Sequence, residues 1–418
     1  MTKPLVALFL GAGASYEAGM PLVWELTAEI RNWLTGPKLR ELNTGWRLQR
    51  SGYSDAVIDD FVSILERPEM HYEALLGYLE TQVLRERDLA QEYHGLYSWL
   101  VELVYHLLYY RQVNNEGYLR QHLPYFDGIR TFVEANEPLW VFTLNHDVMI
   151  EMIAARLSIP VHSGFSSATI TLPRRDADGK KTGEIRAEVL TRHNLDNGAL
   201  HFPNPPRAGI NLLKIHGALD VFTFNDGQDL FRLLPDVPEQ NGVIDVLRAA
   251  NEDLFYLLPG APGGRAKAIN EITYTDDTGE MQFLRRSLLA GAYKFDARGS
   301  QILPQSMLKH FRQSLNFVSR LVCIGYGFGD LHINGVLRDW LEFSSRRHLE
   351  IVNPNAKEVP PFLLHLSPQV SLIPSNATDY FDKKAGIVRS RREKLDKRVN
   401  AALGEARKLT GGQWPAGF

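Results

Sequence analysis

Short apolar segments that end in glycine or polar residues are the feature that most constrains the fold of this 418-residue chain. Five of them stand out, at residues 5–10, 138–144, 211–215, 321–324 and 349–352. Continuous apolar runs of this length are typical of strands that are buried on both faces, as in a parallel sheet. The chain is therefore expected to be an α/β protein with helices on both faces of such a sheet.

Each apolar segment is followed by a distinctive cluster. The clusters are Gly11–Ser15, Asn145–Asp147, His216–Gly217, Gly325–Asp330 and the single residue Asn353. Open parallel sheets bind ligands in the crevice at the carboxyl ends of their strands. We therefore expect these clusters, which are distant in the sequence, to converge on one crevice.

The intervals between the strands predict insertions. Residues 36–130 show helical spacing of apolar side chains and are expected to form a helical insertion. Residues 163–210 alternate around the turn Asp176–Gly179, which indicates a hairpin, and residues 218–300 are expected to be rich in loops, with a loop at 259–264 that can move. We expect residues 1–381 to form the catalytic domain.

The C-terminal segment, residues 382–418, holds ten Lys and Arg against four Asp and Glu. It is expected to be a basic helix with a loose end. A run of charges is usually a solvated helix face, and docking onto a partner protein is the second interpretation. Direct binding of nucleic acid is the interpretation that we favour least.

Composition excludes several classes of protein. The chain has 46 basic and 49 acidic residues, a net charge of -3 and 44% apolar residues, which is ordinary for a globular protein. No overall charge bias points to nucleic acid or to a membrane. The only cysteine is Cys323, so neither an internal disulfide nor a four-cysteine zinc site can form. We expect a cytoplasmic protein without a membrane span.

Each cluster has a structural alternative when it is taken alone. Gly11 and Gly13 fit a dinucleotide motif that approaches a pyrophosphate with backbone N–H groups, or a tight turn without a ligand; Tyr16 replaces the third glycine. Asn145 and Asp147 point into one cleft or serve as turn and cap residues. His216 is catalytic or structural.

Asp330 and His332 have the same ambiguity, because either can cap a helix or lie on the surface. The spacing of the 13 histidines matches no metal-binding motif, so we expect no metal site.

Taken in order along the chain, the clusters resemble the motif series of the sirtuins. The motifs that carry the resemblance are Gly11–Ser15 with Gly19–Pro21, Thr143–Asp147, Lys214–Gly217, Gly325–Asp330 and Ile351–Asn353. The resemblance implies a Rossmann-like domain that uses NAD+ as a substrate. The helical insertion and the basic tail lie outside it.

The resemblance also implies roles for single residues. Asn145 would position a water molecule or the ribose, Asp147 would hold the nicotinamide carboxamide, and His216 would act as a base on the ribose hydroxyls. The NAD phosphates and the adenosine would be contacted by Gly11, Ala12, Gly13, Ser15, Gly325, Tyr326 and Asn353. Residues near Asp379 and Tyr380 would cover the adenine.

The chain differs from the protein-deacetylating sirtuins at three places, and these differences indicate which sirtuin-like proteins it resembles more. The four-cysteine zinc module is absent, residues 22–24 replace the usual continuation after Pro21, and residues 326–328 replace a serine-bearing stretch. The chain is therefore more similar to zinc-free, sirtuin-like NAD-cleaving domains of bacterial anti-phage defence. In length it resembles the sirtuin-like partner of a HerA-type ATPase.

That resemblance implies an NAD+ hydrolase, a homo-oligomer and control by a partner ATPase or by assembly. Departure of neutral nicotinamide leaves an oxocarbenium-like ribose that water can trap. An NAD-dependent deacylase without zinc and a sensor that binds NAD or ADP-ribose without turnover remain alternatives.

Overall fold

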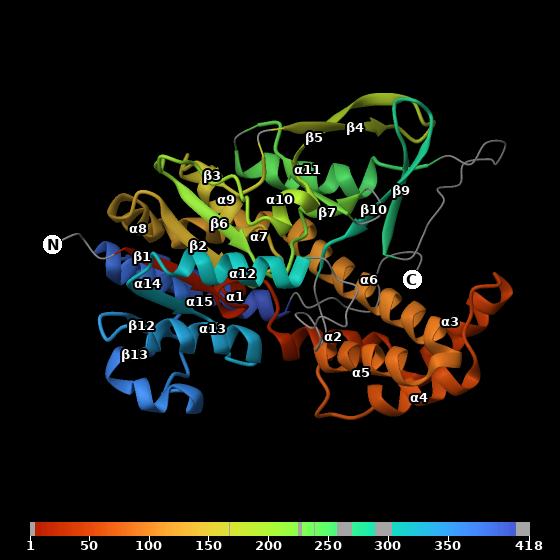
Figure 1. The fold of residues 1–418 in the computed structure, drawn as a ribbon, viewed down its shortest axis with the longest axis horizontal. Helices are drawn as coiled ribbons and strands as arrows, with labels where there is room; N and C mark the ends of the chain where they lie inside the picture. Colours follow the sequence, from red (N-terminus) through yellow and green to blue (C-terminus); the bar gives the residue numbers. More distant parts are fainter. Residues whose placement is uncertain are drawn as a thin grey trace.

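The computed structural model describes residues 5–166, 168–224, 228–237, 239–256, 270–288 and 303–406. The described strands form two sheets, one of seven strands and one of six (Figure 1). The loop expected at 259–264 lies outside the described residues.

The seven-stranded sheet confirms the α/β prediction. Every neighbouring pair of its strands is parallel. From edge to edge the strands are β13 (Val370–Ile373), β12 (His348–Val352), β11 (Arg320–Ile324), β1 (Val6–Leu10), β2 (Leu139–Thr143), β6 (Ile210–Lys214) and β3 (Val161–His162). The five expected strands are present, and the edge strand β13 was not foreseen.

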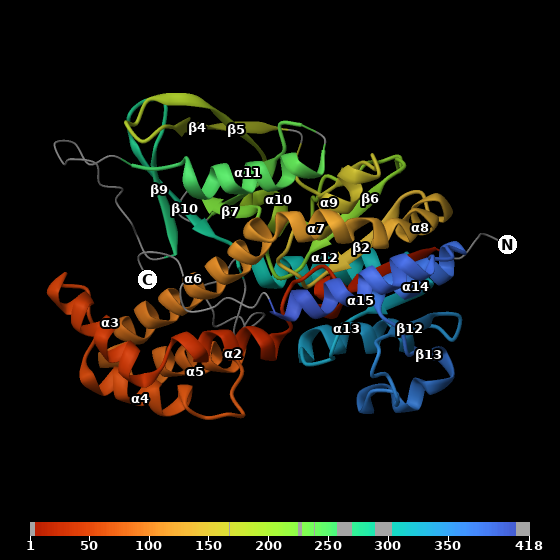
Figure 2. The same ribbon diagram turned by 180° about the vertical axis from the view of Figure 1, so that it is seen from behind.

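Two hydrophobic clusters cover the two faces of this sheet. Alternate residues of β1 point to opposite sides, so that Leu8 joins one cluster and Phe9 the other. Three helices pack on the side of Leu8: α8 (Arg130–Ala135), α9 (Met149–Arg156) and α14 (Ala377–Ala385). Two helices pack on the side of Phe9: α12 (Leu303–Leu315) and α13 (Leu331–Glu342) (Figures 1 and 2).

The helical insertion is present and forms a lobe beside the sheet (Figure 1). Its long helix α6 (Ala90–Asn114) runs from this lobe into the body of the protein and is buried along most of its length. The other elements are α3 (Gly36–Leu48), α4 (Asp55–Leu65), α5 (Tyr72–Arg85), η1 (Arg87–Leu89), α7 (Glu116–His122) and η2 (Leu123–Ile129). Two further helices, α1 (Gly13–Tyr16) and α2 (Val23–Trp33), connect β1 to the lobe.

The six-stranded antiparallel sheet corrects the expectation of a loop-rich segment at 218–300. Only the hairpin around Asp176 was foreseen. The strand order is β4 (Thr169–Arg175), β5 (Lys181–Leu190), β8 (Asp229–Leu234), β7 (Val221–Phe224), β10 (Met281–Arg286) and β9 (Glu271–Thr275). With α11 (Gln240–Glu252) these strands bury apolar residues that are too widely spaced along the chain to show one alternating pattern. A short helix, α10 (Arg192–Asp196), follows β5.

The basic C-terminal segment begins inside a helix of the body, because the boundary expected at 381 falls within α14. Gly386, at φ +66°, ends that helix. The next helix, α15 (Arg391–Ala406), packs back onto the protein: Lys397 pairs with Glu17 at 3.1 Å and with Asp379 at 2.6 Å. The described part of the tail is therefore not a fully solvated helix.

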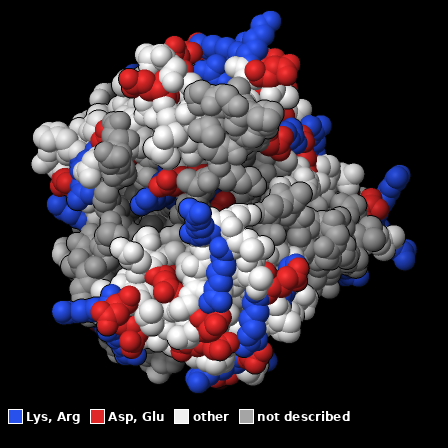
Figure 3. All heavy atoms as spheres, turned by 90° about the vertical axis from the view of Figure 1, so that its right-hand side faces the viewer, with Lys and Arg blue, Asp and Glu red and all other residues white. Residues whose placement is uncertain are grey.

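Charges are mixed over the face of the molecule seen in Figure 3. Lys and Arg side chains alternate there with Asp and Glu, and neither sign forms a broad patch. Among the described residues, no helix combines the length and the apolar composition that crossing a membrane requires.

A 3-10 segment, η3 (Pro361–Gln369), leads into β13.

Candidate functional site

Glycine allows the turns after β1 and β11 to touch. A Cβ atom on Gly11 would lie 2.6 Å from the Cα of Tyr326, and one on Gly13 would lie 2.8 Å from the Cα of Gly325. Gly325 itself has φ +66°, and a Cβ there would overlap the backbone of Ala14. The glycines of two separate motifs are therefore required by a single contact between the two turns.

The same contact corrects one expectation about phosphate binding. The N–H of Gly11 donates to the carbonyl of Ile324 at 3.0 Å, and the N–H of Gly13 donates to the carbonyl of Gly325 at 2.9 Å. These two N–H groups are engaged within the protein, so they do not face a pyrophosphate. The small size of Gly11 and Gly13 instead serves the contact between the two turns, because the backbone of Gly325 and Tyr326 occupies the space beside them.

The side chain of Asn145 is held in one orientation at the end of β2. Its Nδ2 donates to the carbonyl of Gly11 and to the hydroxyl of Ser15, each at 3.0 Å. A carbonyl can only accept, so the amide nitrogen must be the atom that faces Gly11. Both amide hydrogens are used, which leaves Oδ1 as the atom of this side chain that can accept a hydrogen bond from water or a ligand.

Ser15 links Asn145 to Asp147. The Ser15 hydroxyl is hydrogen-bonded to the buried Asp147 carboxylate, which also accepts from the N–H of Met149 at 3.0 Å. Burial raises the pKa of Asp147, and the hydrogen bond from Ser15 and the charge of Lys214 offset this only in part. Asp147 thus closes a turn just before α9, in a series of hydrogen bonds that reaches Asn145.

His216 follows β6 and is almost completely buried. Its Nε2 lies 3.4 Å from Oδ2 of Asp330, the residue that precedes α13. The ring of His146 is 6.4 Å away, centroid to centroid. The structure therefore brings together His216 and Asp330, which follow β6 and β11 and are 114 residues apart in the sequence.

Tyr326 contributes to the site through its backbone. Its ring packs edge-on against Phe9, with the centroids 5.3 Å apart, and its hydroxyl lies 3.0 Å from Oδ1 of Asn334. Burial raises the pKa of Tyr326 well above its usual range. The hydroxyl is thus used to fix the turn after β11, and the Cα of Tyr326 meets Gly11.

Ala12 and Asn353 complete the predicted set. Ala12 precedes α1, between the two glycines. Asn353 stands after β12, one strand further from β1, and its Oδ1 accepts from the N–H of Asn355 at 2.9 Å. The residues that the structure joins directly are Gly11, Gly13, Ser15, Asn145, Asp147, Gly325 and Tyr326.

A buried network of charged side chains, which was not predicted from the sequence, supports the site. Lys214, at the end of β6, donates to the backbone carbonyl of Asp147 at 2.8 Å. Its ammonium also lies 2.7 Å from Glu151 and 3.2 Å from Asp220, and Arg232 of β8 pairs with Asp220 at 3.1 Å. A lysine inside an otherwise apolar strand was the one sequence signal for this network.

The network connects the two sheets electrostatically. Burial alone would lower the pKa of Lys214, but Asp220 and Glu151 raise it above its usual value. Conversely, burial would raise the pKa of Asp220, and Lys214 with Arg232 lowers it. The charged forms of Lys214, Asp220 and Arg232 are thus favoured, whereas burial raises the pKa of Glu151 despite Lys214. Lys214 ties the six-stranded sheet to the backbone that carries Asp147.

Two cavities lie near the site. The larger, about 660 Å³, is beside α1, and its lining includes Tyr16, Glu17, Arg111, Tyr118, Asp379 and Lys397. Asp379, expected near the adenine, lines it, but none of the residues predicted to be catalytic or to contact the NAD phosphates does. The smaller, about 20 Å³, lies beside Lys214, Gly217 and Arg232. Tyr380, expected near the adenine, is instead buried with its hydroxyl on Glu350.

The described residues hold no cluster of three or more His, Cys, Asp and Glu side chains placed to bind a metal ion. Cys323 is buried in β11.

Comparisons with known proteins give distant likenesses only. No family model and no curated protein sequence matches the chain. Among solved structures, a triple mutant of a Sir2 homologue in complex with 2'-O-acetyl ADP ribose aligns over 94% of this chain and 93% of its own, with 12% identity and a TM-score of 0.38.

A Sir2 homologue in complex with NAD aligns over 94% of this chain and 90% of its own, with 12% identity and a TM-score of 0.36. A structure described in terms of sirtuin substrate affinity covers 91% and 92%, with 11% identity and a TM-score of 0.37. Values this low establish neither a shared family nor a shared activity.

Proposed function

We propose that the protein hydrolyses NAD+ at the bond between nicotinamide and ribose. The observation that carries this proposal is the fixed amide of Asn145. Its two hydrogens are taken by Gly11 and Ser15, so Oδ1 is presented as a hydrogen-bond acceptor at the carboxyl edge of the parallel sheet. A water molecule held there is aligned for attack on the ribose.

In the proposed reaction the C–N bond breaks with its electron pair going to nicotinamide, which leaves as a neutral molecule. Water then adds to the oxocarbenium-like ribose carbon and loses a proton, giving ADP-ribose. Asn145 orients the water, His216 accepts a proton from a ribose hydroxyl and returns it to the same oxygen once water has added, and Asp147 holds the carboxamide. Substrate and one water thus give nicotinamide, ADP-ribose and one proton.

The glycines and the remaining predicted residues would bind the rest of the dinucleotide. Gly11, Gly13 and Gly325 bring the two turns together, Ala12 would lie beside the phosphates, and Ser15 fixes Asn145. Tyr326 and Asn353 would lie toward the adenosine. No resident cofactor or metal is proposed, because NAD+ is the substrate.

One experiment distinguishes hydrolysis of NAD+ from the two alternative functions, peptide deacylation and NAD+ sensing. Nicotinamide and ADP-ribose are quantified by chromatography after incubation of the protein with NAD+, with and without an acetylated peptide. A hydrolase releases both products without peptide, whereas a deacylase needs the peptide. A sensor binds NAD+ in calorimetry but releases nothing.

The variants Asn145→Ala and His216→Ala distinguish a hydrolase from a sensor. In a hydrolase both variants retain binding of NAD+ and lose turnover, while in a sensor they weaken binding. A wild-type protein that neither binds NAD+ nor releases nicotinamide contradicts the proposal.

We further propose that the activity depletes NAD+ during anti-phage defence in bacteria. Constant turnover would be toxic, so assembly into a homo-oligomer or a partner such as a HerA-type ATPase would control it. The resemblance of the motif series supports this role. Adding the ATPase to the nicotinamide assay tests it, with stimulation as the expected result.

A further inference from the structure

We propose that the cavity between α1 and α15 is a second ligand site, which binds a phosphorylated small molecule of mononucleotide size. Its volume is about 660 Å³. Sites for small molecules and cofactors usually have volumes of about 300–1,000 Å³. Gly11, Ser15, Asn145 and His216 are not part of its lining. The inference goes beyond the proposed function, because binding in this cavity can be measured without any turnover of NAD+.

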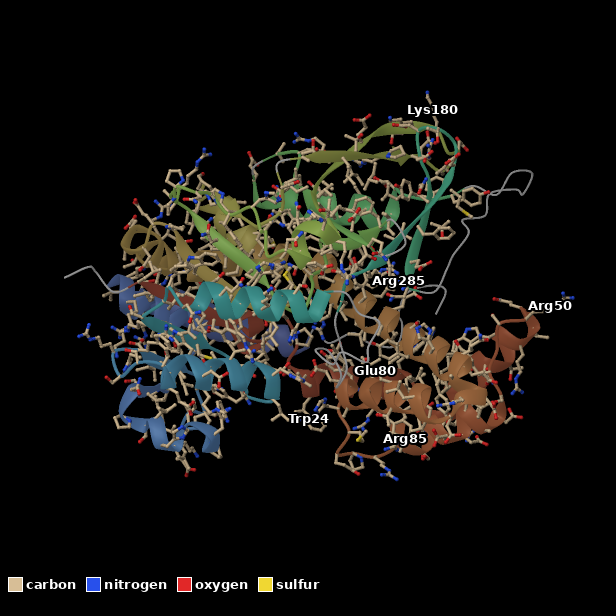
Figure 4. All side chains as sticks on the ribbon, in the orientation of Figure 1. Trp24, Arg50, Glu80, Arg85, Lys180 and Arg285 are labelled. Carbon is tan, nitrogen blue, oxygen red and sulfur yellow. The ribbon has the colours of Figure 1, made fainter. Side chains whose placement is uncertain are left out.

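The lining of the cavity has an apolar part and a basic part. The loop between α1 and α2 contributes residues 19–21, and Trp24 near the start of α2 marks this region in Figure 4. The basic part comes from α15, which lies beside α14 in Figure 2 and contributes Lys394, Lys397 and Arg398. A ligand that carries both a ring and an anionic group matches these two parts.

Two carboxylates of the lining are neutralised by Lys397. Its ammonium lies 3.1 Å from Glu17 and 2.6 Å from Asp379. Burial alone would lower the pKa of Lys397, but Glu17 and Asp379 raise it above its usual value. Thr378 also donates to both carboxylate oxygens of Glu17, from its N–H at 2.9 Å and from its hydroxyl at 2.8 Å. These two acidic groups are therefore satisfied within the protein.

The third carboxylate of the lining, Glu25, also has partners within the protein. One of its oxygens accepts from the hydroxyl of Tyr16 at 3.1 Å, and the other accepts from the N–H of Leu22 at 3.0 Å. Each oxygen thus has a donor from the chain itself, so the carboxylates of the lining do not require a cationic ligand.

The other three cations of the lining are not matched in this way. The side chains of Lys394 and Arg398 form no ion pair with a described residue. Arg111 is almost completely buried, and its Nη2 donates to Glu29, whereas its Nε makes no hydrogen bond within the described part of the chain. A guanidinium has five N–H donors, of which this bond uses one. The hydrogen-bonding capacity that the lining leaves unused is therefore cationic, which favours an anionic ligand.

A phosphate monoester is the anion that fits this lining best. Its oxygens accept several hydrogen bonds at once, and both guanidinium and ammonium groups bind it well. Inorganic phosphate alone would leave most of the cavity empty, so the phosphate is expected to be attached to a larger group. The ribose and base of a mononucleotide supply such a group, and the apolar residues 19–21 would cover the base.

The cavity adjoins the crevice of the proposed reaction through α1. The hydroxyl of Ser15 is hydrogen-bonded to Asn145, and the next residue, Tyr16, lines the cavity. A ligand in the cavity would therefore lie beside the helix that fixes Asn145, although Asn145 itself is not in the lining.

The test is calorimetry of the full-length protein with three probes: AMP, adenosine, which lacks the phosphate, and ribose 5-phosphate, which lacks the base. We expect AMP to bind more tightly than either fragment. In the double variant Lys394→Met with Arg398→Met, the Kd for AMP should rise by about tenfold or more, because two charged partners of the phosphate are lost. The unfolding midpoint should stay unchanged, because both side chains are exposed.

The matched control is Arg392→Met. It removes a cation from the same helix, two residues before Lys394, but Arg392 is 92% exposed and is not part of the lining. This variant should bind AMP as the wild type does. Asn145→Ala should also keep its affinity for AMP, which distinguishes the cavity from the crevice, since AMP is a part of NAD+.

Three results would overturn the inference. They are a wild type that does not bind AMP, AMP binding that the double variant leaves intact or that Asn145→Ala abolishes, and equally tight binding of adenosine or of ribose 5-phosphate. If AMP binds as expected and the wild type releases no nicotinamide from NAD+, the proposed function fails and the second site stands.

Discussion

The backbone N–H of Gly13 donates a hydrogen bond of 2.9 Å to the carbonyl of Gly325, joining the turn after β1 to the turn after β11. The two glycines belong to motifs more than 300 residues apart, and each lacks the Cβ atom that would force the turns apart. This contact sets the geometry of the crevice, because Asn145 and Ser15 are hydrogen-bonded to the first turn and Asp330 follows the second.

Gly325→Ala should therefore destabilise the protein. Alanine at φ +66° costs about 1–2 kcal/mol, and the overlap with the backbone of Ala14 adds to this. Denaturation by urea measures the change in the free energy of unfolding. The matched control is Gly327→Ala, where no atom lies within 4 Å of the added Cβ and φ is not positive. Equal stability of the two variants would contradict the packing role of Gly325.

Ser15→Ala should lower turnover more than stability. It removes one acceptor of the Asn145 amide, which is then held by the Gly11 carbonyl alone, and one hydrogen bond to Asp147. Loss of such a bond costs about 1 kcal/mol in stability, whereas a misplaced water should lower kcat about tenfold or more. Ser63→Ala removes an exposed hydroxyl elsewhere and serves as the control. A variant with unchanged kcat would show that Ser15 does not position Asn145.

Much of this site can be predicted from the sequence because the strand ends are local features. An apolar run followed by glycine, asparagine or histidine is visible in a few consecutive residues, and parallel strands bring such ends to one edge. That logic predicted that the ends of β1 and β2 meet, and the hydrogen bond from Asn145 to Gly11 joins them. The position of His216 relative to Asn145 stays a prediction. It did not detect that the N–H groups of Gly11 and Gly13 are used between the turns.

The remaining features depend on contacts between distant segments. Four strands of the six-stranded sheet, β7 to β10, fall in the segment expected to be rich in loops. β7 and β8 are short and β9 lies far along the chain from them, so no single window shows the alternation. The ion pairs of Lys214 join residues from two sheets and one helix, and nothing adjacent to Lys214 in the sequence indicates its partners.

Lys214→Met should be strongly destabilising. The substitution removes the buried ammonium that pairs with Glu151 and Asp220, which lowers the free energy of unfolding by about 3–5 kcal/mol. The folded protein raises the pKa of Lys214, so this group stabilises the fold fully below pH 10.5 and loses that contribution as the pH rises through the folded pKa. The stability difference between wild type and variant should therefore be constant near neutral pH and shrink above pH 10.5.

Lys181→Met is the control for this experiment. Lys181 also pairs with two carboxylates, Glu184 and Asp277, but on the surface of the hairpin, where solvent screens such pairs and they contribute little to stability. Chemical denaturation across pH 7–11 measures both variants. Similar losses for the two lysines would contradict the supporting role assigned to the buried network.

Cys323 should be inert in the folded protein. Its thiol is buried in the central part of the parallel sheet, and burial raises its pKa far above the usual range, so little thiolate forms. A thiol reagent at pH 8 should label the protein only after denaturant is added, with a yield of one label per chain. Rapid labelling of the native protein would contradict the placement of β11 between β1 and β12.

The central claim is that Asn145 and His216 act together on NAD+. The most direct measurement is the release of nicotinamide by the purified full-length protein in the absence of any acylated peptide, beside Asn145→Ala and His216→Ala and with NAD+ binding measured for all three. The account predicts equal amounts of nicotinamide and ADP-ribose from the wild type, and binding without release from both variants. Release that persists in both variants would contradict it.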